Sequence, residues 1–137
     1  MGPDFTPRAG ADGWQISNPP IMAMAPLLAS LRIFDEVGMP ALRDKSRVLT
    51  GFLWFLLREW MPTGCDILTP ADPGARGCQL SIAIADRARE RHAQLADRGV
   101  ICDFREPNII RLAPVPLYNG FEQVFDAASI LCERASA

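Results

Sequence analysis

The stretch CQLSIAIADRARERHAQLADRGVICDFREPNIIRL, residues 78–112, decides the fold class of this chain. Its first part, residues 78–85, alternates apolar side chains with small or polar ones. Leu80, Ile82 and Ile84 therefore share one side of the backbone, which is typical of a strand with one buried face. The stretch begins with a strand that should cover a core on one side only.

A helix and two further strands follow within the same stretch. Asp86 is a residue type that caps helices, and the segment after it predicts a helix to about Arg98. Gly99 suits the left-handed residue that commonly follows a helix. Residues 100–104 and 109–112 are two apolar runs, and the Pro-Asn pair between them indicates a turn.

Helical periodicity dominates on either side of this stretch. Apolar residues of the last helix recur at i, i+3, i+4 and i+7, and the earlier helices each carry one apolar stripe. Helices are expected at 21–37, 41–60 and 121–134, and one more strand at 65–69. The order α-α-β-β-α-β-β-α predicts an α+β two-layer sandwich, with a small, mostly antiparallel sheet covered by helices.

The domain organisation expected from the sequence is one small domain with an arm before it. Residues 1–20 are rich in Pro and Gly and cannot form a regular helix or a central strand. They still contain Phe5, Trp14 and Ile16, which favours an ordered N-terminal arm. Residues 21–137 are predicted to form a single α+β domain.

Composition excludes several classes of protein. The chain has 137 residues, of which 49% are hydrophobic, and a formal net charge of −2. A slightly acidic chain is a poor nucleic-acid binder, and no apolar run reaches the ~20 residues of a membrane span. No secretory signal is recognised at the start, so a cytoplasmic location is expected. The predicted partners include neither nucleic acid nor membrane.

Few residues could perform catalysis or bind a metal. Lys45 is the single lysine and His92 the single histidine, and both lie among charged residues of predicted helices. We expect both to be solvated, with Arg87 and Arg91 on an ordinary exposed helix face. The four cysteines form no CxxC pair, so we expect no metal site and reduced, mostly buried thiols.

Two polar positions could bind a ligand. Arg111 follows two isoleucines and precedes Leu112, and a guanidinium in so apolar a setting needs an acceptor. That acceptor could be a ligand carboxylate, or Glu106 or Asp103 in a structural salt bridge. Ser17 and Asn18 precede two prolines that restrict the backbone, so they could face a ligand or cap the following helix.

Several motifs together resemble one enzyme family. They are GWQISNPPI at 13–21, LRDKSRVLTGFL at 42–53, RGCQLSI at 76–82, GVICDFREPNIIRLAP at 99–114 and PLYNGFEQV at 116–124. In this order they resemble the C-terminal region of kynureninase, a pyridoxal-phosphate (PLP) enzyme of the aspartate-aminotransferase fold class. The resemblance runs from about Phe5 to the last helix.

The resemblance implies roles for three residues. Arg111 matches the family's arginine that binds the substrate α-carboxylate. Asn18 matches an asparagine in the cofactor and substrate pocket, and Ser17 the serine beside it, near the substrate's aromatic ring. The family's pocket is shared between two subunits, so the implied partners are a PLP-binding large domain or second subunit and a kynurenine-type substrate.

The chain also departs from the family, because nothing in it matches the Schiff-base lysine motif and no catalytic residue is assigned. We therefore expect part of a homodimeric kynureninase of tryptophan catabolism, the kynurenine pathway and NAD biosynthesis. It would hydrolyse kynurenine or 3-hydroxykynurenine, and the isolated chain should be inactive.

The alternative is a free-standing, non-catalytic α+β binding or assembly module. A cysteine desulfurase small domain is disfavoured, since no cysteine has an evident reactive setting. Self-association is expected in either of the first two cases.

Overall fold

The computed structural model describes residues 5–15 and 17–133. The chain divides into two units, Met1–Gly38 and Met39–Ala137, and each is described here by itself. The sequence placed its boundary after residue 20, and that assignment stays a prediction. No helix among the described residues is both long and apolar enough to cross a membrane.

The first unit holds a short 3-10 helix η1, Gly10–Trp14, and the helix α1, Ile21–Val37. Gly38 ends α1 with a positive φ of 81°, and its N–H donates to the carbonyl of Phe34 at 2.8 Å. This confirms the helix expected at 21–37, which ends where the sequence predicts. No residue of α1 is buried, although most of its side chains are apolar.

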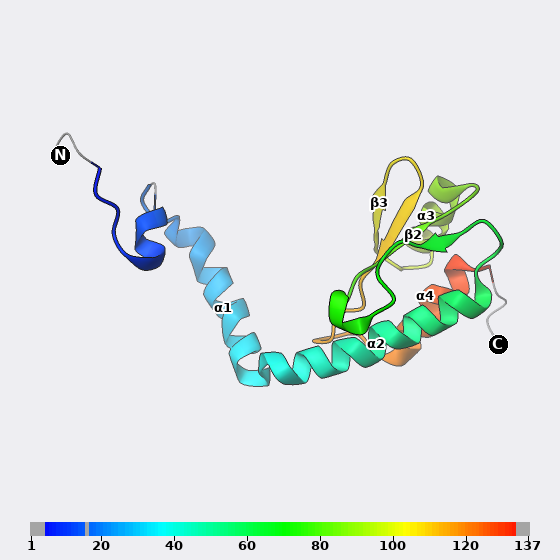
Figure 1. Cartoon of the computed structure of the whole chain (residues 1–137), viewed down its shortest axis with the longest axis horizontal. Coiled ribbons are helices and arrows are strands. Elements are labelled where there is room, and N and C mark those ends of the chain that lie inside the picture. The colour runs from blue at the N-terminus through cyan, green and yellow to red at the C-terminus, as the bar shows by residue number, and fades with distance from the viewer. Residues whose placement is uncertain (1–4, 16, 134–137) are drawn as a thin grey trace. The chain divides into compact units, whose positions relative to one another are not determined.

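The second unit contains the remaining elements in the predicted order (Figure 1). The strands are shorter than the apolar runs that predicted them, because the hydrogen-bonded pairing between strands covers only part of each run. The second helix starts two residues earlier than expected. The elements are α2 Met39–Trp60, β1 Asp66–Ile67, η2 Pro73–Ala75, β2 Leu80–Ala83, α3 Ala88–Asp97, β3 Asp103–Arg105, β4 Ile109–Leu112 and α4 Phe121–Leu131.

The sheet has four strands in the order β1-β2-β4-β3, and every neighbouring pair is antiparallel. The helix α3 carries the chain from β2 to β3, and β4 then returns between these two strands. β2 pairs with β4 so that Ser81 lies opposite Arg111, and β3 pairs with β4 so that Asp103 lies opposite the same arginine. The predicted α+β sandwich with a small antiparallel sheet is confirmed.

One face of the sheet is closed by helices and forms the core. Leu80, Ile82 and Ile110 are fully buried on this face, where alternate residues of each strand point. The helices α2 and α4 lie side by side (Figure 1), with α3 packed against α4. The helices contribute buried side chains to the same cluster: Leu49, Leu53, Leu56 and Leu57 from α2, Ala88 and Leu95 from α3, and Val124, Ala128 and Leu131 from α4. The opposite face carries no helix of this cluster and holds the polar residues described below.

The start of α3 differs from the prediction. Asp86 does not cap the helix, because Arg87 occupies the cap position in a left-handed conformation with φ 52°. That conformation turns the chain before the helix begins and leaves Asp86 outside it. Its carboxylate pairs instead with the side chain of Arg87 at 3.6 Å.

Two side chains of α3 are less solvated than expected. His92 is half-buried, with Nε2 3.0 Å from the carbonyl oxygen of Cys102 and its ring tilted against Phe104. The side chain of Arg91 is 12% exposed and donates to the carbonyl of Leu131 at the end of α4. The prediction of a solvated face is wrong at both positions because this side of α3 packs on β3 and α4.

None of the four cysteines takes part in a disulfide among the described residues, and all four are half-buried. Cys102 lies at the edge of the core beside Asp103. Partial burial, and secondarily the negative charge of Asp103, raise the pKa of its thiol. This thiol is therefore poorly suited to act as a thiolate nucleophile.

Candidate functional site

The open face of the sheet gathers polar side chains into one row. Side chains two apart on a strand share a face, so Arg111 lies opposite to Ile110 and Leu112, away from the core. The strand register then sets Ser81 of β2 on one side of Arg111 and Asp103 of β3 on the other. Three strands thus bring a hydroxyl, a guanidinium and a carboxylate together.

Arg111 forms an ion pair with Asp103. Nε of the guanidinium donates to Oδ2 of the carboxylate, and Nη2 lies within ion-pair distance of the same oxygen. Arg105 also donates from Nε to this oxygen, at 2.9 Å. The side chains of Arg111 and Asp103 are 29% and 44% exposed, so the pair remains accessible to a ligand.

The surroundings of Asp103 favour its charged form. Desolvation by itself would raise the pKa of this carboxyl group. The hydrogen bond from Arg111 and the positive charges of Arg105 and Arg111 outweigh desolvation and lower the pKa below its usual range. Asp103 is therefore a carboxylate wherever the domain is folded near neutral pH.

A depression with a volume of about 460 Å³ lies over this row. Arg111 and Ser81 form part of its lining, and the segment after β1 forms another part. Its lining residues are Leu68, Thr69, Pro70, Ala75, Arg76, Gly77, Gln79, Ser81, Arg105, Ile109 and Arg111. Three arginines in one depression favour an anionic ligand.

The loop of residues 70–77 is fixed by two arginines. Arg76 donates to the carbonyls of Pro70 and Ala71, and its guanidinium lies 4.8 Å from the ring centroid of Trp54 on α2. Arg43 of α2 donates to the carbonyl of Pro73. One loop carbonyl accepts from α2, and Arg76 binds two others while it stacks on Trp54 of α2, so this wall of the depression is held in place.

The hairpin of β3 and β4 is anchored to β2 by Asn108. Its side-chain amide donates to the carbonyl of Ile84 at 2.9 Å, and its own carbonyl accepts from the N–H of Ile84 at 3.0 Å. The turn that the sequence predicted at this point therefore also sets the position of β4. Through β4 it holds Arg111 in register with Ser81.

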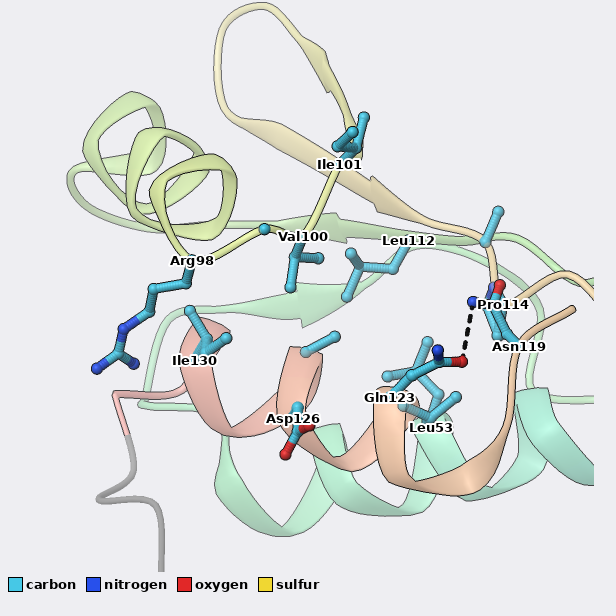
Figure 2. Close-up of a pocket in the computed structure, with 14 residues that line it drawn as sticks. Leu53, Arg98, Val100, Ile101, Leu112, Pro114, Asn119, Gln123, Asp126 and Ile130 are labelled. Atoms are coloured by element: carbon cyan, nitrogen blue, oxygen red, sulfur yellow. Dashed lines mark hydrogen bonds between the residues drawn. The ribbon is translucent and has the colours of Figure 1, made fainter.

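A second, larger pocket of about 730 Å³ lies between α4 and the segment before β3. Figure 2 shows Val100 and Leu112 directed into it, whereas Arg98 and Asp126 point away. The polar side chains of Asn119 and Gln123, which line this pocket, are engaged in hydrogen bonds at the start of α4. Gln123 accepts from the amide of Asn119 at 3.3 Å and from the N–H of Gly120, in a cap of α4 (Figure 2). This pocket presents no converging polar groups, so the depression over Arg111 is the better candidate site.

Ser17 and Asn18 lie in the first unit, in the exposed segment before α1. The carbonyl of Ser17 accepts from the side chain of Gln15 at 2.9 Å. Helix α1 is capped by the backbone of Pro20 without a side-chain cap, so the capping alternative for Asn18 is wrong. Both polar side chains are thus available to a ligand. Their ligand-binding roles stay predictions.

The residues described do not by themselves make a PLP site. PLP enzymes bind the cofactor through a lysine Schiff base, and such a lysine is desolvated or has a cationic neighbour. Lys45 is exposed on α2 and lines neither pocket. Within residues 5–15 and 17–133, no group of three or more metal-ligating side chains is found either.

Several residues of the depression did not emerge from the sequence. Thr69, Gln79 and Arg105 line it, and Arg76 holds its wall, yet none of the four was predicted. Alternation on the strands was the one available signal, because it puts every second residue on the open face. Which strand lies beside which is not contained in that signal.

Known proteins match this chain over most of its length. A sequence profile described as the kynureninase C-terminal domain covers residues 42–131. The chain belongs to the kynureninase family. Kynureninase of Xanthomonas campestris pv. campestris (strain B100) is 54% identical over 124 residues, covering 88% of this chain. Kynureninase of Christiangramia forsetii (strain DSM 17595 / CGMCC 1.15422 / KT0803) is 49% identical over 134 residues, covering 96% of it.

The match covers only part of the relatives. This chain spans 29% of the Xanthomonas campestris kynureninase and 32% of the Christiangramia forsetii one. The family membership confirms the resemblance read from the motifs. It also agrees with the exposed position of Lys45, since most of a kynureninase lies outside the matched segment.

Proposed function

We propose that this chain is the part of a kynureninase that binds the α-carboxylate of the substrate, with Arg111 as its anchor. The reaction would be the PLP-dependent hydrolysis of kynurenine or 3-hydroxykynurenine to the corresponding anthranilate and alanine, in tryptophan catabolism. The observation that carries the proposal is the Arg111 guanidinium in the lining of a depression, with Nε and Nη2 engaged and Nη1 facing no partner among the described residues. A planar guanidinium binds a carboxylate through two parallel hydrogen bonds.

The other two ligand contacts come from the first unit. Asn18 would reach the cofactor and Ser17 the aromatic ring of the substrate, in a pocket completed by a second subunit or a PLP-binding domain. Their exposure, and the capping of α1 without them, support this role. When bound, PLP supplies the electron sink for the reaction. This chain positions the substrate around it.

The proposal is tested by grafting. This chain replaces the matching segment of the Xanthomonas campestris kynureninase, and anthranilate release from L-kynurenine is followed with PLP present. The grafted enzyme should turn over, and Arg111→Ala should raise KM about a hundredfold, since two charge-assisted hydrogen bonds are lost. Arg89→Ala is the matched control, because Arg89 pairs with Glu106 outside the depression.

Two results would contradict the proposal. One is a grafted enzyme that stays inactive although it folds and binds PLP. The other is an Arg111→Ala enzyme with the KM of its parent. The chain alone should release no anthranilate from L-kynurenine and PLP, because its lysine is exposed on α2.

A non-catalytic assembly module is the second candidate function. It is favoured by α1, which exposes apolar side chains along its length, including Met22, Leu28 and Ile33. Such a helix needs a covering surface, and a second copy of the chain is one source. Concentration-dependent sedimentation of the isolated chain would support self-association, and a strict monomer would count against it.

A further inference from the structure

The Arg111 guanidinium offers two edges, each able to donate two parallel hydrogen bonds to a carboxylate. The edge formed by Nε and Nη2 is taken by Asp103. No other partner of this guanidinium is found within residues 5–15 and 17–133, so the edge formed by Nη1 and Nη2 keeps its donors. One arginine can therefore hold an internal carboxylate and a ligand carboxylate at the same time.

The position of Asp103 is set by the sheet and not by the arginine. Asp103 and Arg111 are directly opposed in the β3–β4 register, and Asn108 ties the hairpin to the end of β2. Arg105, two residues along β3, also donates to the same carboxylate oxygen. The carboxylate is thus a fixed point to which the flexible side chain of Arg111 is attached.

Charge in the row still favours an anion. Asp103 neutralises only one of the two guanidinium groups that contact it, so an excess positive charge remains beside the depression. Arg76 adds a third cation to the lining. The internal carboxylate therefore orders Arg111 without cancelling the attraction of the site for a second carboxylate.

We propose that Asp103 is a positioning residue for substrate binding: it holds the Nε–Nη2 edge of Arg111 so that the Nη1–Nη2 edge faces the carboxylate of the amino-acid substrate. This inference rests on the proposed function, in which Arg111 binds that carboxylate. An arginine that is not held in advance has to be ordered when the ligand binds, which costs side-chain entropy. Holding it in advance lowers KM without touching the reacting atoms.

The opposite role for Asp103 makes an opposite prediction. If it merely occupied Arg111 until substrate displaced it, removing the carboxylate would free the arginine and raise the positive charge of the site. KM would then fall. The sign of the change in KM separates a positioning residue from a competing one.

The test uses the grafted enzyme and two substitutions, Asp103→Ala and Asp103→Asn. We expect Asp103→Ala to raise the KM for L-kynurenine about tenfold, with kcat within about twofold of the parent, because binding and not the chemical step is affected. Asp103→Asn keeps an oxygen acceptor for Arg111 and should recover part of the loss. Glu106→Gln is the matched control. It removes a carboxylate from the same hairpin, but this carboxylate pairs with Arg89 outside the depression.

A second measurement, on the isolated chain, reports the contact itself. The Nε–H resonance of Arg111 in ¹⁵N NMR should be protected from exchange with water in the wild type and in Glu106→Gln, and should lose that protection in Asp103→Ala. Retained protection in Asp103→Ala, or a KM that is unchanged or lowered, would overturn the inference. An Arg111→Ala enzyme with the parent KM would instead overturn the proposed function, so the two failures are distinguishable.

Discussion

Cys102 and Asp103 are neighbours in the chain, yet their surroundings differ and their pKa values shift in opposite directions. Cys102 faces the core, where burial raises the pKa of its thiol. Asp103 faces the open side, where two arginines outweigh its desolvation and lower the pKa of its carboxyl group. One step along the chain, at the start of β3, is enough to exchange an apolar environment for a cationic one.

The comparison extends to the whole sheet. On β4, Ile110 and Leu112 belong to the core, whereas Ile109 and Arg111 line the depression. The closed face contributes stability through buried apolar area, and the open face presents groups to a ligand. Substitutions on the two faces should therefore have separate consequences.

The largest effect is expected from substitutions of the two adjacent isoleucines of β4. Ile110→Ala should lower the free energy of unfolding by about 3–4 kcal/mol, since a fully buried side chain leaves a cavity. Ile109→Ala is the matched control, and we expect a loss of about 1 kcal/mol because the residue is only half-buried. Urea unfolding measures both. Equal losses would mean that the two faces are not energetically distinct.

A smaller effect concerns acid. The pKa of Asp103 is lower in the folded chain than in the unfolded one. Its ion pair therefore stabilises the fold fully at pH values above the unfolded pKa of about 4. This contribution is lost as the pH falls through the folded pKa. Wild type should be more stable than Asp103→Asn at pH 7, and the gap should close below about pH 4. Urea unfolding at several pH values measures the gap. A gap that is constant with pH would mean that the charge of Asp103 does not stabilise the fold.

The smallest effect is expected at Cys102. Its alkylation by iodoacetamide should follow a pH profile with a midpoint above that of the same cysteine in the urea-unfolded chain, because burial disfavours the thiolate. Asp103→Asn should move that midpoint down, since the negative charge of Asp103 is the second cause of the raised pKa. Mass spectrometry of the labelled peptide gives the rate. An unmoved midpoint in the variant would show that the two neighbours do not interact.

Local patterns were enough to predict most of the elements. Alternation at Leu80, Ile82 and Ile84 identified a strand and its buried face, and all three side chains are buried. Gly99 follows α3 as expected, and α1 ends at the predicted residue before Gly38, with positive φ at both glycines. These predictions succeeded because a strand repeats every two residues and a helix every 3.6, so a short window contains the information. The prediction that Asp86 caps α3 was wrong, because the left-handed backbone of Arg87 is not indicated by any pattern of residue types.

The sequence by itself determined the order of the elements, the face of each that is buried, the scarcity of lysine and histidine, and motifs specific enough to indicate the family. It left Arg111 with two possible internal partners, Glu106 and Asp103. Only the tertiary structure decided between them, because the β3–β4 register sets Asp103 opposite Arg111 and leaves Glu106 in the turn, where it pairs with Arg89. The strand order and the partial burial of His92 were decided in the same way. Contacts between segments far apart in the chain depend on how the whole core packs, and no local repeat encodes them.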